Sequence, residues 1–218
     1  MADLAGRRLY LCTPDRPDLE QFVTDCIEGG VDVVQLREKH LKDRALVERA
    51  LMLRELCRGA GVPFILNDRP DLALECGADG VHVGQDDVPP RVARQILGPA
   101  AVIGLSTHSP ADLADSLDQP VDYISAGPVV PTPSAPDRAG VGLGYITQAV
   151  AGAGRPVWVT GGASPTTVGG IVGAGASHVV VVRWLTEAPD PRAAARSLRQ
   201  ALDEALEGSV GPALEPSE

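Results

Sequence analysis

Short apolar runs alternate with amphipathic segments along most of the chain. Eight of these runs are rich in Val, Ile and Leu and recur at regular intervals, a pattern typical of buried strands in a parallel sheet. The segments between them have a hydrophobic period near 3.6, which predicts helices with one apolar face. We therefore predict strands over residues 8–12, 31–36, 63–67, 80–84, 102–106, 123–126, 156–160 and 178–182.

Two of the predicted helices are marked most clearly. The first covers residues 43–60, and its apolar stripe is Leu46, Ala50, Leu53 and Cys57. The second covers residues 190–206, and its inward face is Ala194, Leu198, Ala201 and Ala205. Three helix starts are indicated by an oxygen-bearing residue before a proline, namely Ser109, Ser164 and Asp190, the last of which begins the second of these helices.

Eight strand–helix units close naturally into a single (β/α)8 barrel, and 218 residues is a typical length for that α/β fold. An open doubly wound sheet is the alternative, although it usually has fewer strands in this length. We assign residues 1–206 to the barrel. We expect residues 207–218, which are rich in Gly, Pro and Glu, to form a disordered tail.

Composition and charge restrict the function classes. Aromatic residues are only 3% of the chain, so we expect a core of Val, Leu, Ile and Ala. A net charge of −10 argues against nucleic acid or an anionic membrane as a partner. Four cysteines without a C-x-x-C pair, no signal peptide and no spanning helix predict a cytoplasmic protein. The oligomeric state stays open, a homo-oligomer included.

In such a barrel, polar residues at the carboxyl ends of the strands form the active site. Gln35, Arg37 and Lys39 fall on one side of the second strand, where two cations beside an amide suit a phosphate or pyrophosphate. The alternative interpretation is an ordinary charged loop whose cations pair with Glu38.

Two aspartates follow neighbouring strands. Asp68 and Asp87 come after the third and fourth strands, whose ends lie roughly 5 Å apart in a sheet. Two carboxylates so placed suit Mg²⁺, which takes one or two carboxylates together with phosphate oxygens. The alternative is that each aspartate caps the helix that begins near Pro70 or Pro89.

The double glycine at Gly161 and Gly162 offers bare backbone N–H groups, which suit an anion; a helix cap without a ligand is the alternative. His82 alternates with valines inside the fourth strand, a pattern more typical of a packed core histidine than of a catalytic one. His108 lies at a strand end and is a better candidate for the site. No His–Cys cluster indicates zinc, and no G-x-S-x-G motif indicates a hydrolase nucleophile.

In order along the chain, six segments resemble the thiamine-phosphate synthase family. They are residues 35–39 (QLREK), 65–68 (ILND), 77–87 (GADGVHVGQDD), 104–109 (GLSTHS), 127–133 (GPVVPTP) and the double glycine at 161. Each motif alone is weakly specific, but six in the same order over residues 8–205 are specific. The family joins hydroxymethylpyrimidine diphosphate to a thiazole phosphate and releases pyrophosphate.

The resemblance implies roles for individual residues. Catalysis would involve Arg37, Lys39 and Ser106, and Mg²⁺ would bind Asp68 and Asp87. The substrate-binding residues would be Gln35, Arg37, Lys39, Asn67, Ser106, Thr132, Ser134, Arg138, Gly162, Val182 and Arg183. Of these, Gly162, Val182 and Arg183 would hold the thiazole phosphate. Departure of pyrophosphate leaves a carbocation that the aminopyrimidine stabilises, so the reaction needs no protein nucleophile, and the sequence offers none.

Two positions depart from the family pattern. The usual Thr-x-Thr-Lys after the sixth strand is here Thr132-Pro133-Ser134-Ala135, so Ala135 stands where a lysine contacts the diphosphate. We hypothesise that Arg138 replaces that charge. Trp184 stands where a small residue is expected, and its indole either narrows the thiazole-phosphate pocket or lies outward. These departures keep two alternatives open: a related thiazole tautomerase, and a homologue that binds thiamine phosphates without turnover.

Overall fold

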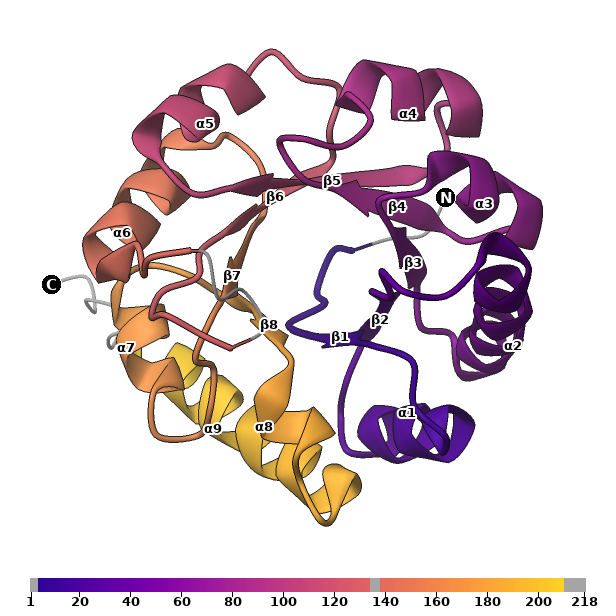
Figure 1. Ribbon diagram of the computed structural model, residues 1–218. Helices are drawn as coiled ribbons and strands as arrows, with labels where there is room; N and C mark the ends of the chain where they lie inside the picture. The colour runs from indigo at the N-terminus through magenta and orange to yellow at the C-terminus, as the bar shows by residue number, and fades with distance from the viewer. Residues whose placement is uncertain (1–3, 134–137, 210–218) are drawn as a thin grey trace, which may run out of the picture.

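The chain folds into a closed barrel of eight parallel strands, which confirms the predicted (β/α)8 class. The structure is a computed structural model, and it describes residues 4–133 and 138–209. The strands pair in sequence order from β1 to β8, and β8 pairs with β1 to close the sheet. Figure 1 looks along the barrel and shows the helices as a ring outside the strands.

The strands lie within two residues of their predicted bounds. They are β1 Leu9–Thr13, β2 Val33–Leu36, β3 Phe64–Asn67, β4 Gly80–Val83, β5 Val102–Thr107, β6 Tyr123–Ala126, β7 Val157–Thr160 and β8 His178–Val181. The largest difference is at β2, which we predicted to begin at Val31. The N–H of Val31 instead donates to the carbonyl of Cys26, closing the end of the preceding helix rather than joining the sheet.

The helices surround this sheet. They are α1 Leu19–Glu28, α2 Asp43–Ala60, α3 Pro70–Cys76, α4 Pro90–Leu97, α5 Pro110–Ser116, α6 Gly142–Gly152, α7 Val168–Gly173, α8 Arg183–Thr186 and α9 Pro191–Ser209. The predicted stripe of α2 is buried in full. Ser109 caps α5 through the N–H of Asp112, and Asp190 accepts from the N–H of Ala193 at the start of α9.

Two helix predictions were wrong in detail. Ser164 does not begin a helix, because residues 164–167 form a turn and α7 starts at Val168. In α9 the fully buried positions are Ala195, Leu198 and Leu202, while the predicted Ala194, Ala201 and Ala205 lie partly buried beside them. This helix also continues to Ser209, three residues past the predicted boundary at 206; residues 210–218 lie outside the described part of the chain.

The barrel has two hydrophobic cores. The larger one lies between the sheet and the helices and is mostly aliphatic, as expected. The second fills the barrel interior and consists of Tyr10, Val33, Ile65, Val102, Tyr123 and Trp158, so half of its buried residues are aromatic. The expectation of an aliphatic core is therefore wrong for the interior, where large aromatic side chains help to fill the barrel.

Three aspartates fasten the amino-terminal ends of the strands. Each lies at or next to the start of an even-numbered strand and accepts a hydrogen bond from a backbone N–H of the strand before it. Asp32 bonds to Arg8 and Leu9, Asp79 to Phe64, and Asp122 to Ile103, at 2.7–3.0 Å. These bonds stabilise the amino-terminal end of the barrel. In such barrels the functional site lies at the opposite end, where the strands have their carboxyl termini.

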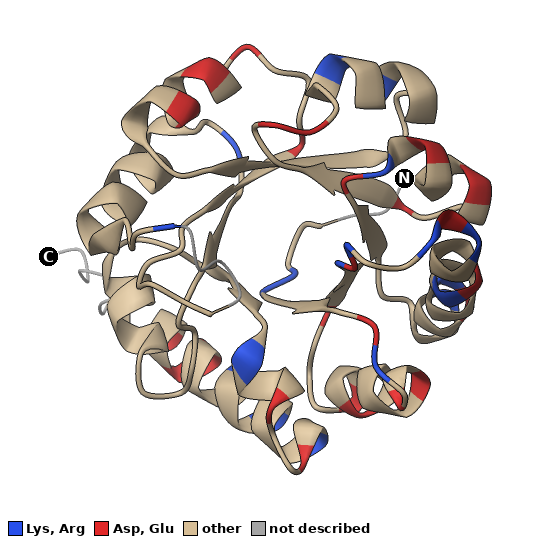
Figure 2. Ribbon diagram, viewed as in Figure 1, with Lys and Arg blue, Asp and Glu red and all other residues tan. Residues whose placement is uncertain are grey.

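Charged residues lie mainly on the outer helices and in the connecting loops, while the strands carry few (Figure 2). Within the described residues, no helix has both the length and the hydrophobicity needed to cross a membrane.

Candidate functional site

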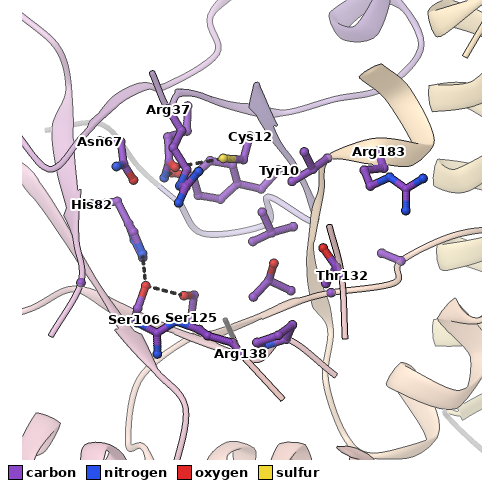
Figure 3. A pocket seen from close by; sticks show the side chains of 18 of the residues that line it. Tyr10, Cys12, Arg37, Asn67, His82, Ser106, Ser125, Thr132, Arg138 and Arg183 are labelled. Atoms are coloured by element: carbon purple, nitrogen blue, oxygen red, sulfur yellow. Dashed lines mark hydrogen bonds between the residues drawn. The ribbon is translucent and has the colours of Figure 1, made fainter. Parts of the chain in front are cut away.

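A pocket of about 710 Å³ opens at the carboxyl ends of the strands. It is lined by every predicted site residue that the structure describes: Gln35, Arg37, Lys39, Asn67, Asp68, Asp87, Ser106, Thr132, Arg138, Gly162, Val182 and Arg183. Ser134 and Ala135 lie outside the described residues. Figure 3 shows the pocket from close by, with Arg37 and Asn67 on one side and Arg183 across from them.

Arg37 and Lys39, which follow β2, do not pair with Glu38. Its carboxylate accepts hydrogen bonds from the backbone N–H groups of Asp15 and His40 instead, so the structure does not support the alternative of a self-neutralised loop. Lys39 lies 3.2 Å from Asp68, measured from Nζ to Oδ2. Arg37 is half-buried and lines the pocket, and its guanidinium forms no ion pair with any described residue.

The two predicted metal ligands lie together. Asp87 accepts from the N–H of Gly84 at 2.8 Å, and Asp68 holds an unusual backbone φ of 63°. Burial, followed by contact with Asp87, raises the pKa of Asp68, while Lys39 acts in the opposite direction. Neither aspartate caps a helix, because α3 and α4 begin without a side-chain cap. The pair is therefore a strained, mutually repelling arrangement, which points to a site role rather than a structural one.

These carboxylates fit Mg²⁺. The described residues contain no group of three or more His, Cys, Asp or Glu that could hold a metal by themselves. Mg²⁺ commonly binds through one or two carboxylates and completes its shell with water and substrate phosphate oxygens. A divalent cation between Asp68 and Asp87 would also relieve the repulsion that raises the pKa of Asp68.

The floor of the pocket was not predicted from the sequence. It is formed by side chains that point into the barrel from three strands, β1, β4 and β6: Tyr10, Cys12, His82, Tyr123 and Ser125. His82 is buried, as expected of a core histidine, but its Nε2 lies 2.9 Å from the hydroxyl of Ser106 (Figure 3). Burial lowers the pKa of His82 to about 4, so this ring is neutral near pH 7. Strand alternation was the signal available: Tyr10 and Cys12 share one side of β1, and Tyr123 and Ser125 share one side of β6.

The double glycine lies beneath the loop that follows β6. Gly161 and Gly162 have φ values of 93° and 89°, which other residues rarely adopt. A Cβ atom on Gly161 would lie 2.5 Å from the Cβ of Pro128. The N–H groups of Gly161 and Gly162 donate to no described residue, and the turn after them is held by Thr167, whose hydroxyl donates to the carbonyl of Gly162 at 2.6 Å. This loop can therefore present free backbone donors to an anion.

The end of β8 has a different character. The guanidinium of Arg183 is occupied by a two-bond contact with Glu187, at 2.7 and 2.9 Å. Because this side chain is engaged, Val182 and Arg183 can contact a ligand in the pocket through their backbone groups. Trp184 is 41% exposed, and its Nε1 donates to the carbonyl of Ala194 at 3.0 Å. The indole is therefore not buried: it is held against the start of α9 and contributes to the lining of the pocket.

Fold and site together define a (β/α)8-barrel protein with a polar, partly cationic pocket of the kind that binds small phosphorylated molecules. A family model described as "Thiamine monophosphate synthase" matches residues 9–185. The chain belongs to this family.

Individual relatives agree. The chain is 42% identical to "Thiamine-phosphate synthase" of Mycobacterium tuberculosis, covering 91% of this chain and 96% of that protein. It is 43% identical to the protein of the same name from Thermus thermophilus, over 89% and 97% of the two chains. The relative from Gloeobacter violaceus is 43% identical, and this chain spans 55% of its length. Among solved structures, the thiamine phosphate pyrophosphorylase from Pyrococcus furiosus superimposes with a TM-score of 0.85 at 32% identity, covering 91% of this chain and 96% of that chain.

Proposed function

We propose that this protein is a thiamine-phosphate synthase, a transferase that joins hydroxymethylpyrimidine diphosphate to a thiazole phosphate and releases pyrophosphate. The proposal follows from the family and its relatives. One observation in the pocket supports it most: the half-buried Arg37 has no carboxylate partner among the described residues, in a chain of net charge −10. A partly desolvated, unpaired cation is costly unless a ligand anion supplies its counter-charge.

The diphosphate would bind on the β2–β3 side of the pocket. Arg37 would form two parallel hydrogen bonds to phosphate oxygens, and Lys39 would add a point charge. The amide of Asn67 bonds to no described residue and would complete the contact. Gln35 is already held by Cys12 and Tyr10, so it has one amide hydrogen left to donate.

Asp68 and Asp87 would hold Mg²⁺ against the same diphosphate. When bound, the metal supplies positive charge that stabilises the departing pyrophosphate. The protein's own part would be to keep the two carboxylates close together, with Lys39 placed to favour the charged form of Asp68.

The thiazole phosphate would bind on the opposite side. Backbone N–H groups near Gly162, Val182 and Arg183 would hold its oxygens, and Thr132 would line the space between the two substrates. Fixing both substrates in one pocket converts a bimolecular reaction into an effectively unimolecular one, which is a large part of such catalysis.

The reaction then needs charge stabilisation rather than a nucleophile. The bond between the pyrimidine methylene carbon and the diphosphate oxygen breaks, and its electron pair leaves with pyrophosphate. The thiazole nitrogen attacks the resulting carbocation and forms the new C–N bond. Cys12 does not compete as a nucleophile, because burial raises the pKa of its thiol to about 12.

Arg138 would supply the charge that Ala135 lacks. It lines the pocket from the loop after β6, and it forms no ion pair with a described residue. Its positive charge would face the diphosphate from the side opposite Asn67. A cytoplasmic location fits the proposal, because all four cysteines are buried and free.

Product analysis tests the function. Incubation of the protein with both substrates and Mg²⁺ is expected to give thiamine phosphate, detected by its mass, whereas omission of either substrate gives none. Binding of both substrates without any product would identify a homologue that has lost turnover. Conversion of the thiazole substrate alone to an isomer would identify a tautomerase.

A further inference from the structure

A continuous series of hydrogen bonds crosses the barrel interior beneath the pocket. The thiol of Cys12 lies 3.1 Å from Oε1 of Gln35, and Nε2 of Gln35 lies 2.9 Å from the hydroxyl of Tyr10. That hydroxyl is 3.1 Å from the hydroxyl of Tyr123, which is 3.0 Å from Nδ1 of His82. The series ends where Nε2 of His82 meets the hydroxyl of Ser106 at 2.9 Å. We call these five residues before Ser106 the donor chain.

The hydrogens of the donor chain are fixed in number. Burial raises the pKa of Tyr10 and of Tyr123, and it raises the pKa of Cys12, so the two phenols and the thiol keep their protons. His82 is neutral and carries one ring hydrogen. Each hydrogen bond between two neighbouring members uses one hydrogen atom, donated by one of the two. The direction of one of these bonds therefore restricts the direction of all the others.

Cys12 sets the direction. A thiol donates weakly and its sulfur accepts weakly, so the favourable partner for Cys12 is the carbonyl oxygen of Gln35 rather than its NH₂ group. The NH₂ group of Gln35 then donates to Tyr10, Tyr10 donates to Tyr123, and Tyr123 donates to Nδ1 of His82. The ring hydrogen of His82 lies on Nε2, from which it donates to Ser106.

The opposite tautomer of His82 does not fit. If Nδ1 carried the hydrogen, it would donate to Tyr123 while Gln35 still donated to Tyr10. The hydroxyl hydrogens of Tyr10 and Tyr123 would then both have to lie in the one hydrogen bond between the two hydroxyl oxygens, which holds a single hydrogen. One buried hydroxyl hydrogen would be left without an acceptor among the described residues, which is unfavourable in a closed interior.

We propose that the donor chain of Cys12, Gln35, Tyr10, Tyr123 and His82 holds His82 as its Nε2–H tautomer and so turns the hydroxyl hydrogen of Ser106 toward the substrate diphosphate. Ser106 accepts from His82 and, at 3.4 Å, from Ser125. Figure 3 shows Ser106 between these two neighbours. Because both donate to its oxygen, its own hydrogen is free to point into the pocket. The inference rests on the proposed function for the identity of the anion, but the tautomer itself does not.

Apart from Gln35, which also faces the diphosphate, the members behind Ser106 are positioning residues, because they act through its hydroxyl. A correctly directed donor matters most as negative charge develops on the leaving pyrophosphate, so its loss lowers kcat more than it raises KM. The other tautomer would make Ser106 donate to His82, and the substrate would face a lone pair instead of a hydrogen.

The tautomer is measured directly by long-range ¹H–¹⁵N correlation spectra of the labelled, ligand-free protein. The ring signals of His82 are assigned by their loss in His82→Gln. A protonated Nε2 and an unprotonated Nδ1 are expected. A protonated Nδ1, or a mixture of the two forms, would overturn the proposal, and this result does not depend on which reaction the protein catalyses.

Kinetics test the consequence. Tyr123→Phe removes the hydroxyl and keeps the ring that stacks on His82, so kcat should fall about 10- to 100-fold with little change in KM. Tyr145→Phe, a matched loss of a phenol hydroxyl on α6 outside the barrel, should leave kcat unchanged. Unchanged kcat in Tyr123→Phe would overturn the proposal even if its melting temperature fell.

Double variants separate positioning from general structural damage. In a Ser106→Ala background Tyr123→Phe should have no further effect on kcat, because the two act through one contact. In a His82→Gln background, where an amide NH₂ donates to Ser106 without a choice of tautomer, Tyr123→Phe should also have little effect. Additive losses in both backgrounds would contradict the donor chain. A wild-type protein that forms no thiamine phosphate but shows the expected tautomer would instead refute only the proposed function.

Discussion

At the scale of single residues, the site is made of polar side chains that the fold does not use. Arg94 shows the ordinary case: its guanidinium bonds to the carbonyls of Gly98, Ala101 and Pro120 and to the carboxylate of Asp122. Arg37 has no such partners among the described residues. The sequence contains many arginines and cannot by itself show which of them are engaged, so the structure adds this distinction.

Replacement of Arg37 tests this account of the diphosphate site. Arg37→Ala should lower kcat/KM by about 10²–10³, the usual loss for one charge-stabilising donor, and Arg37→Lys should recover part of it. Arg44→Ala is the matched control, since Arg44 is exposed on α2 and, within the described part of the chain, its ion pair is with Glu48. Steady-state kinetics with the diphosphate substrate varied give both values. Equal activity of Arg37→Ala and the control would contradict the assignment.

Arg138 and Ala135 form a separate prediction. If Arg138 supplies the charge that the family usually takes from lysine, Arg138→Ala should weaken diphosphate binding and lower turnover by roughly 10- to 100-fold. Adding Ala135→Lys to that variant should restore much of the loss. Turnover and diphosphate affinity that stay unchanged in Arg138→Ala would rule the replacement out.

At the scale of elements, the hydrophobic pattern predicted most of the fold. The eight strands follow from the regular spacing of short apolar runs, and α2 follows from its period near 3.6, because its apolar stripe is buried. The start of α7 was missed since Ser164 and Thr167 bond to each other in a turn, which uses the same residue types as a helix cap. In α9 several alanines lie next to one another, so the sequence does not fix which of them face the barrel. The buried face is shifted by one residue from the predicted one at Ala195 and Leu202.

The contact between β5 and the floor of the pocket gives a prediction at this scale. A Cβ atom on Gly104 would lie 2.1 Å from Cζ of Tyr123 and 2.5 Å from Nδ1 of His82. Gly104→Ala should therefore destabilise the protein by about 3 kcal/mol or more through overpacking and displace both rings. Gly59→Ala is the control, since Gly59 is exposed in α2 with open space around it, and it should stabilise by roughly 0.5–1 kcal/mol. Chemical denaturation measures both, and similar stabilities would contradict the packing described here.

At the scale of the whole molecule, the barrel separates stability from function. Its amino-terminal end carries Asp32, Asp79 and Asp122, which tie strand to strand. Its carboxyl-terminal end carries the pocket, and the aromatic interior lies between them. The residues at the rim of the pocket could be predicted from the sequence, because they belong to polar motifs that directly follow the predicted strands. The floor could not, because Tyr10, Tyr123 and Ser125 resemble ordinary strand residues until the barrel brings them together.

Buried histidines make the stability of the whole barrel depend on pH. Burial lowers the pKa of both His82 and His178 from 6.5 to about 4. Between those values the unfolded chain binds protons that the folded chain does not, so stability falls as the pH drops from about 6.5 to 4. The fully buried His82 would account for about 3 kcal/mol of this loss, and the partly buried His178 for less. Denaturation at pH 7 and pH 4.5 should show a smaller loss for His82→Gln than for the wild type; an equal loss would contradict the assignment.

The rate of pyrophosphate release tests the central claim most directly. The wild-type protein is mixed with the pyrimidine diphosphate, the thiazole phosphate, or both, first with Mg²⁺ and then with a chelator. We expect release only when both substrates and Mg²⁺ are present, with one thiamine phosphate formed for each pyrophosphate. An absence of release, or release that is independent of the thiazole phosphate and of the metal, would contradict the account.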